Sequence, residues 1–300
     1  MTEQDIKQRL GCNDALFNNI FLFRQQFDIV PQKEHYGLSI AYQDIQELRK
    51  SFLSQLVDTV VDWVYSSEKF AKLQMQFAAT GKTPAAAASE VVNKAKQKFR
   101  TSDDKLLIQG QLGELVLFNF IQHVFHAIPL LRKMPITTSS DIERFGSDAI
   151  HYTVRDDKNI IILGEAKAYT SEYAFNSALE ASIASILSSY NNFRDEMNLY
   201  LHEDFVDKEA DQIAEAFLSN TLPNTQIELV CLVMYDESTA INVTNEADIQ
   251  AQIEDIIKRR YASYDNSKID VSQPILRRIT YAIFPVWKFK ELATEFSKLL

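Results

Sequence analysis

The chain is 300 residues long, with 46% hydrophobic and 24% charged residues, which is enough for one large globular domain or two of ordinary size. Its formal net charge of -10 argues against a free-standing nucleic-acid-binding module, but not against an enzyme to which another subunit delivers the nucleic acid. Only seven glycines and seven prolines occur, which favours long regular elements and a helix-rich fold.

The N-terminal sequence, MTEQDIKQRLGCND, is polar and does not have the pattern of a signal peptide. No run approaches the roughly 18 apolar residues of a membrane-spanning helix. Cys12 and Cys231 lie far apart and outside any metal-binding spacing, so both are expected to be reduced thiols. These features predict a cytoplasmic protein that does not associate with a membrane.

Residues 1–101 are expected to form a mostly helical N-terminal region. The first 30 residues are weakly patterned. Apolar residues then recur at helical spacing from Tyr42 to Phe77, as two helices separated near Ser66, and a further helix begins after Thr83.

Residues 102–300 alternate between helical and strand patterns. An apolar helix is followed by a short strand near 131–138, by strands at 147–154 and 159–170, and then by helix, helix, strand, helix, strand and helix. This order predicts an α/β fold with a mixed sheet flanked by helices, in which the hairpin is antiparallel and helical crossovers join the later strands.

Three charged side chains interrupt the apolar hairpin GSDAIHYTVRDDKNIIILGEAKAYT. Glu165 and Lys167 are two residues apart, so both project from one face at the end of a buried strand. Asp148 opens the preceding strand. A loop at 155–159 would place Asp148 opposite Ala166 and on the other face, whereas a bulge, or a loop one residue longer or shorter, would bring all three together.

The chemistry of these residues points to a metal site. Two carboxylates a few ångströms apart repel each other unless a cation lies between them, and oxygen ligands favour Mg²⁺ or Mn²⁺. A bound divalent ion activates water and stabilises charge on a phosphate oxygen, while a lysine can orient or deprotonate the water or stabilise the transition state. The alternative is an exposed Glu165–Lys167 pair with Asp148 capping a turn. The core strand and the helix straight after it favour a site for metal-assisted phosphodiester hydrolysis.

The order of helix and hairpin, with Asp148 followed by Glu165-Ala166-Lys167, resembles the core of the PD-(D/E)XK nuclease superfamily, which has a restriction-endonuclease-like fold. The resemblance implies that Asp148 and Glu165 bind metal and that Lys167 acts on the water. A glutamate on the preceding helix often joins them, and QGQLGELVLF supplies it as Glu114. The superfamily's proline before the aspartate is replaced by Ser147.

The segments RFGSDAIHYTV and IILGEAKAYTSEYAFNSALEASIASILSSY are similar to the HamA family, the nuclease subunits of Hachiman anti-phage defence systems. The resemblance covers roughly residues 105–300. It implies a Mg²⁺-dependent (or Mn²⁺-dependent) deoxyribonuclease that acts on DNA and is controlled by a helicase partner, HamB. Residues 1–101 lie outside the nuclease core and are expected to dock this partner.

Two other functions stay open. One is a restriction-type endonuclease with its own target sequence. The other is a catalytically silent interaction or sensor protein on the same fold, against which the intact Glu-x-Lys triplet argues.

Weaker signals have ordinary structural explanations. His151 is expected to be a hydrogen-bonded core or edge residue. His123 and His126 have no third ligand nearby in sequence, so zinc is not expected. The basic runs at 94–100 and 258–260 are typical of solvated faces, but they are the best candidates for contacts with a nucleic-acid backbone.

Overall fold

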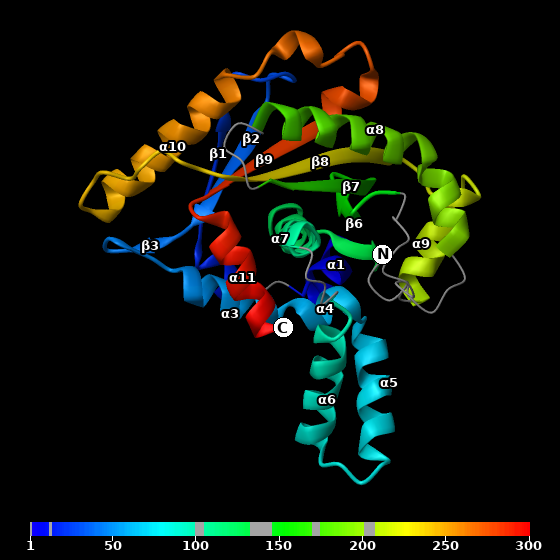
Figure 1. Ribbon diagram of the computed structural model, residues 1–300. Coiled ribbons are helices and arrows are strands. Elements are labelled where there is room, and N and C mark those ends of the chain that lie inside the picture. Colours follow the sequence, from blue (N-terminus) through cyan, green and yellow to red (C-terminus); the bar gives the residue numbers. More distant parts are fainter. Residues whose placement is uncertain (1, 12–13, 100–104, 133–145, 170–174, 201–207) are drawn as a thin grey trace.

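The computed structural model describes residues 2–11, 14–99, 105–132, 146–169, 175–200 and 208–300. A seven-stranded sheet with the order β1-β2-β9-β8-β7-β6-β5 lies at its centre (Figure 1). Its strands are β1 (Ile20–Gln26), β2 (Glu34–Ile40), β5 (Ile128–Leu131), β6 (Ala149–Arg155), β7 (Lys158–Tyr169), β8 (Thr225–Asp236) and β9 (Ile279–Val286). A small second sheet pairs β3 (Tyr42–Gln43) with β4 (Gln46–Glu47).

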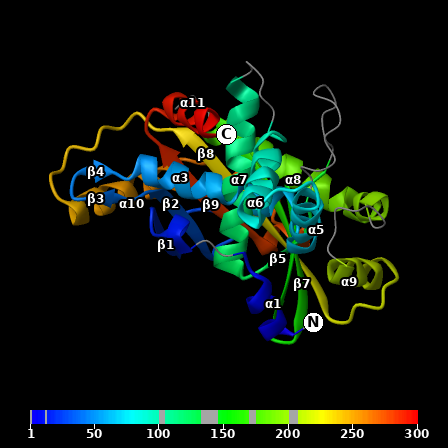
Figure 2. The ribbon, with the colours of Figure 1, turned by 90° about the horizontal axis from the view of Figure 1, so that it is seen from below.

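Helices cover both faces of the large sheet. α8 (Phe175–Tyr200) and α10 (Glu246–Ala262) pack on one face, and α7 (Lys105–Phe125), α3 (Arg49–Asp58) and α11 (Phe289–Leu299) pack on the other, which Figure 2 views. This arrangement confirms the predicted mixed sheet flanked by helices. The remaining helices are α1 (Glu3–Arg9), α2 (Asp14–Phe17), α4 (Val60–Val64), α5 (Ser67–Ala78), α6 (Pro84–Lys96), α9 (Lys208–Leu218), η3 (Asn266–Lys268) and η4 (Pro274–Arg278).

The direction of the strands follows the predicted connections. β6 and β7 form an antiparallel hairpin, and β7, β8, β9 and β2 run parallel to one another. The crossover from β7 to β8 contains α8 and α9, and that from β8 to β9 contains α10. The continuous apolar runs of β7 and β9 are explained by this position, because central parallel strands are buried on both faces.

The N-terminal region contains two strands of the central sheet as well as helices. β2 pairs in parallel with β9, with Tyr36 opposite Ala282, and β1 pairs with β2 at the edge. Residues 20–40 therefore complete the sheet that carries residues 128–286. The domain boundary expected at residue 101 lies outside the described residues. Most of the strand expected at 131–138 also lies outside them, and the structure has strand β5 slightly earlier, at Ile128–Leu131.

The helices predicted after Ser66 and after Thr83 are present, but the helix predicted from Tyr42 is only partly correct. Residues 42–47 form the β3–β4 hairpin, which turns at Asp44 with a φ of +58°, and the helical stretch that follows is divided at Thr59 into α3 and α4. Ser66 caps α5 by accepting a hydrogen bond from the Lys69 N–H, and Thr83 caps α6 by accepting one from Ala86. α5 and α6 form an antiparallel pair that projects away from the sheet (Figure 1). In the part of the chain that the structure describes, no helix has both the length and the apolar character needed to cross a membrane.

Candidate metal centre at the end of strand β7

The turn of the β6–β7 hairpin decides which face Asp148 occupies. Arg155 pairs with Lys158, so only Asp156 and Asp157 form the turn, and both have positive φ as a type I′ turn requires. The loop at 155–159 considered from the sequence is therefore wrong, and the register is shifted by one residue. Since Ala149 pairs with Gly164, continuing the register places Asp148 opposite Glu165.

Asp148, Glu165 and Lys167 consequently share one face of the sheet, because directly opposed residues in an antiparallel pair point the same way. This is the α8 face, to which Ile161 and Leu163 also point. The Asp148 carboxylate accepts a 2.9 Å hydrogen bond from the backbone N–H of Ala166. That bond holds the aspartate at the level of the other two charged residues.

Glu165 is a buried carboxylate that is paired with Lys167. Its side chain is 3% exposed, and its Oε1 lies 2.8 Å from Lys167 Nζ. Its Oε2 has no hydrogen-bond partner among the described residues. Lys167 is 29% exposed, so the glutamate of this pair is buried and the lysine reaches solvent.

The electrostatics of the site reflect two carboxylates held close together. Burial and the nearby charge of Asp148 raise the pKa of Glu165 to about 7, although Lys167 and the Ser185 hydroxyl act in the opposite direction. Burial alone would lower the pKa of Lys167, but the charge and hydrogen bond of Glu165, with a contribution from Asp148, leave that pKa raised. The lysine is therefore a cation at neutral pH, while Glu165 is close to the midpoint of its titration.

These residues fit a divalent cation of the Mg²⁺ or Mn²⁺ type. A buried carboxylate oxygen without a partner and a second carboxylate beside it form a set of hard oxygen donors, and a cation between them removes their repulsion. Asp148 and Glu165 could hold such an ion, with water completing its coordination shell.

Glu114 lies on α7, on the other side of the sheet. Its neighbour Gly113 faces Ala166 and Ala168, which point away from the Glu165 face. Within the described ranges, no group of three or more His, Cys, Asp or Glu side chains is placed to hold a metal ion. The structure thus brings Asp148 and Glu165 together, and a metal-binding role of Glu114 stays a prediction.

Helix α8 supplies two residues near the site that the sequence did not single out. The Ser185 side chain acts to lower the pKa of Glu165. Glu196, itself buried, accepts a 3.2 Å hydrogen bond from the backbone N–H of Ser147, next to Asp148. Gly146 has a φ of +119°, and a Cβ there would lie 2.2 Å from Glu196 Oε1. Glu196 therefore shapes the turn into β6. In the sequence, only the Ser/Ala-rich pattern of α8 pointed to this helix as part of the site.

His151 lies outside the site. It is buried on the α7 face with its ring 5.4 Å from that of Phe118. Burial, with a contribution from the charge of Arg132, lowers its pKa to about 3. It is a core residue as expected, but neither ring nitrogen has a hydrogen-bond partner among the described residues. His123 stacks on Phe17, 3.7 Å between ring centroids.

The cysteine of β8 is also near the site. Cys231 pairs with Glu165 in the β7–β8 register and is buried. Burial raises the pKa of its thiol, so Cys231 is a packing residue beside the carboxylate. Cys12 lies outside the described residues.

Comparison with known proteins supports the resemblance seen in the sequence. A family model described as HamA matches residues 15–300, which extends beyond the 105–300 expected and includes both N-terminal strands. A search of curated proteins finds no match.

Proposed function

The chain belongs to the HamA family and is thereby a defence protein associated with the Hachiman system, and on that premise we propose that it is a metal-dependent DNA nuclease. It hydrolyses phosphodiester bonds in DNA with Mg²⁺ or Mn²⁺. A helicase partner controls this activity. The net charge of -10 supports such dependence on a partner, because an acidic surface does not attract DNA by itself.

One observation carries the proposal. Asp148, Glu165 and Lys167 come together on one face at the end of a buried parallel strand. Ligands of α/β sheets bind at the carboxyl ends of such strands. A merely structural Glu–Lys pair would not need a second carboxylate that raises the pKa of the glutamate.

Each residue has a distinct role. Asp148 and Glu165 would hold the ion, which when bound lowers the pKa of a water molecule and stabilises charge on a phosphate oxygen. Lys167 is protonated and held by Glu165, so it donates hydrogen bonds to the attacking water or to the scissile phosphate rather than accepting a proton. Glu196 and Ser185 position the two carboxylates.

The experiment is a cleavage assay on labelled DNA with the purified chain, alone and with its helicase partner, in EDTA, Mg²⁺ or Mn²⁺. We expect cleavage only with a divalent cation, and its loss in Glu165→Gln and Lys167→Met. Arg155→Gln is a matched control, since Arg155 lies on the same hairpin at its far end, beside Glu228. Full activity in the first two variants would overturn the site, and no cleavage by the wild-type chain under any condition would favour a silent interaction protein.

A further inference from the structure

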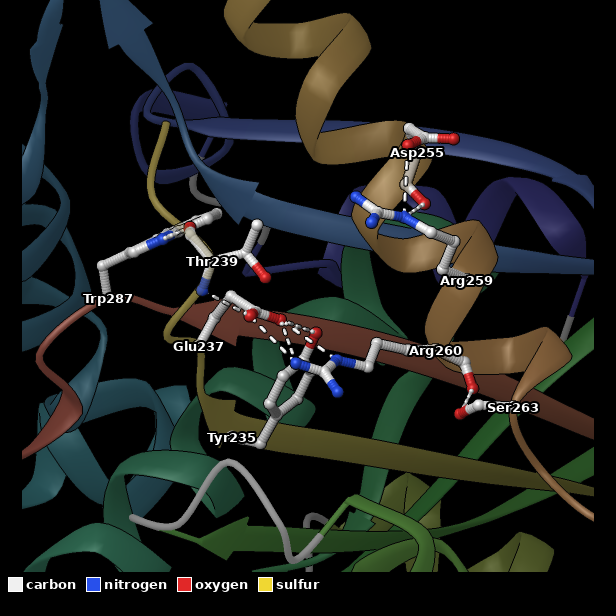
Figure 3. A network of polar contacts seen from close by, with 8 residues as sticks. All are labelled: Tyr235, Glu237, Thr239, Asp255, Arg259, Arg260, Ser263 and Trp287. Carbon is white, nitrogen blue, oxygen red and sulfur yellow. Dashed lines mark hydrogen bonds and ion pairs between the residues drawn. The ribbon is translucent and has the colours of Figure 1, made fainter. Parts of the chain in front are cut away.

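Strand β8 ends beside the candidate metal centre, and an unusual polar network lies there (Figure 3). Lys167 pairs with Val233 and Tyr169 pairs with Tyr235 in the parallel β7–β8 ladder. Tyr235 therefore points to the same face as Glu165 and Lys167. From the spacing of strands and residues, the Cα atoms of Lys167 and Tyr235 are about 8 Å apart.

Glu237, the first residue after β8, is the centre of this network. Its side chain is fully buried and accepts hydrogen bonds from the Tyr235 hydroxyl at 2.9 Å, the Thr239 N–H at 2.8 Å and the Arg260 guanidinium. The Arg260 bonds come from Nη2 at 2.9 and 3.1 Å and from Nε at 3.2 Å. The Trp287 indole donates to the Thr239 carbonyl at 2.8 Å, which fixes the loop from the other side.

Arg260, at the end of α10, is held in one orientation by these contacts. Its guanidinium carbon lies 5.6 Å from the centre of the Tyr235 ring. Its bonds to Glu237 use Nε and Nη2, which leaves Nη1 unused by them, and its side chain is 29% exposed. The network thus joins a fully buried carboxylate to a partly exposed guanidinium.

Stability alone is a weak reason for such an arrangement. A buried ion pair seldom stabilises a fold more than apolar packing does, because the desolvation of both charges offsets their attraction. A preorganised guanidinium, in contrast, suits recognition of phosphate, since its planar N–H donors match phosphate oxygens and little side-chain entropy remains to be lost.

We propose that Arg260 binds a backbone phosphate of the DNA next to the scissile phosphate, with Glu237 and Tyr235 as its positioning residues. The proposal rests on the proposed nuclease function, and it gives the substrate a second anchor one strand away from Lys167. DNA would then lie across the carboxyl ends of β7 and β8. This also explains how an acidic protein has a local contact for a polyanion.

Arg259 provides a matched control. It is adjacent in sequence and has the same charge, but it is 62% exposed, pairs with Asp255 at 3.2 Å and extends along another side of α10 (Figure 3). Arg259→Gln and Arg260→Gln therefore change the net charge equally, but only Arg260→Gln removes a guanidinium from the Glu237 network. Arg260→Lys keeps the charge beside Glu237 but loses the planar fork, so it tests phosphate recognition in a fold whose ion pair persists.

The test measures binding of a fluorescent DNA duplex, and of one of its single strands, to the full chain by anisotropy over a range of salt concentrations. The chain carries Glu165→Gln and Mg²⁺ is present, so that DNA is not cut. We expect Arg260→Gln to weaken binding about tenfold and to reduce the slope of log affinity against log salt by about 1, while Arg259→Gln changes neither. Arg260→Lys is expected to weaken binding by an intermediate factor while its unfolding midpoint stays close to that of the parent.

Three outcomes would overturn the proposal: equal binding by the Arg259 and Arg260 variants, loss of unfolding stability in Arg260→Lys without a change in affinity or salt slope, or no DNA binding by the parent chain. DNA cleavage is measured separately, with the chain that retains Glu165. Absence of cleavage with normal DNA binding counts against the nuclease function alone.

Discussion

Asp148 accepts a hydrogen bond of 2.9 Å from the backbone N–H of Ala166, the residue between Glu165 and Lys167. The bond ties the aspartate of one strand to the Glu-x-Lys triplet of the next. It also keeps the Asp148 charge close enough to Glu165 to raise the pKa of that carboxyl.

Asp148→Asn should separate the charge of this residue from its structural role. The amide oxygen can still accept the hydrogen bond from Ala166, so we expect the free energy of unfolding to change by less than about 1 kcal/mol. Metal-dependent cleavage should fall by at least about 100-fold, because one anionic ligand is lost. Asp148→Ala, which loses both functions, is the comparison in urea unfolding and cleavage assays. A cleavage rate near wild type in Asp148→Asn would remove Asp148 from the site.

Glu165→Gln should alter how stability depends on pH. In the folded protein the pKa of Glu165 is raised to about 7 from 4.5, so between these values the folded state keeps a proton that the unfolded state has released. Wild-type stability therefore falls as pH rises through this window and stays low above it.

The glutamine variant lacks this titration. In EDTA we expect it to be more stable than wild type at about pH 8 by about 1–3 kcal/mol, a gain that is reduced by loss of the pair with Lys167. Near pH 4.5 it should have little of this advantage, because Glu165 of the folded wild type is then protonated. Urea unfolding at both pH values measures the difference. Parallel stability curves for the two proteins would show that the Glu165 pKa is not raised.

His151→Phe should stabilise the protein. The two ring nitrogens of His151 are buried without a hydrogen-bond partner among the described residues, and phenylalanine of similar shape removes that penalty, giving about 1–2 kcal/mol. The lowered pKa of about 3 also means that the wild type loses stability as pH falls below the ordinary histidine pKa of 6.5, since the unfolded state then binds a proton that the folded state does not. The advantage of the variant should therefore widen at acidic pH, measured by thermal unfolding, and a destabilised variant at neutral pH would contradict this.

Gly146→Ala should disturb the turn that leads to Asp148. A φ of +119° is strained for alanine, and the new Cβ would lie 2.2 Å from Glu196 Oε1, so we expect a loss of about 2 kcal/mol or more together with reduced cleavage. Adding Glu196→Ala should recover the part that comes from the clash. Gly110→Ala on α7 is the control, because no atom of the residues that the structure describes lies within 4 Å of its Cβ position and a helical alanine is favourable by up to about 1 kcal/mol. Equal effects of the two glycine substitutions would argue against a role of Glu196.

The fold could be predicted where the apolar pattern is continuous. The Ile-Ile-Ile-Leu run of β7, the buried β9 and the long α7 follow from local sequence, and their alternation fixes the crossovers. β1 and β2 could not be found this way. They carry Arg24, His35 and Gly37 among their apolar residues, and β2 is held by pairing with a strand some 245 positions later, Tyr36 with Ala282.

The candidate site divides in the same way. Spacing alone places Glu165 and Lys167 on one face, and the structure agrees. The face of Asp148 depends on a two-residue turn formed by Asp156 and Asp157, whose positive φ values have no strong signal in an Asp-Asp sequence. Glu196 and Arg260 come from helices distant in sequence, so only the assembled sheet shows which carboxylate and which strand end they meet.

The most direct test of the paired carboxylates is Mn²⁺ binding to the full chain by isothermal titration calorimetry, in the absence of DNA and partner. We predict saturable binding that releases protons near neutral pH, because the ion displaces the proton that Glu165 holds there. Asp148→Asn and Glu165→Gln should each weaken binding at least about tenfold, while Glu237→Gln, at the neighbouring strand end, should leave it unchanged. Equal Mn²⁺ affinity in the wild type and the two carboxylate variants would contradict a metal centre at the end of β7.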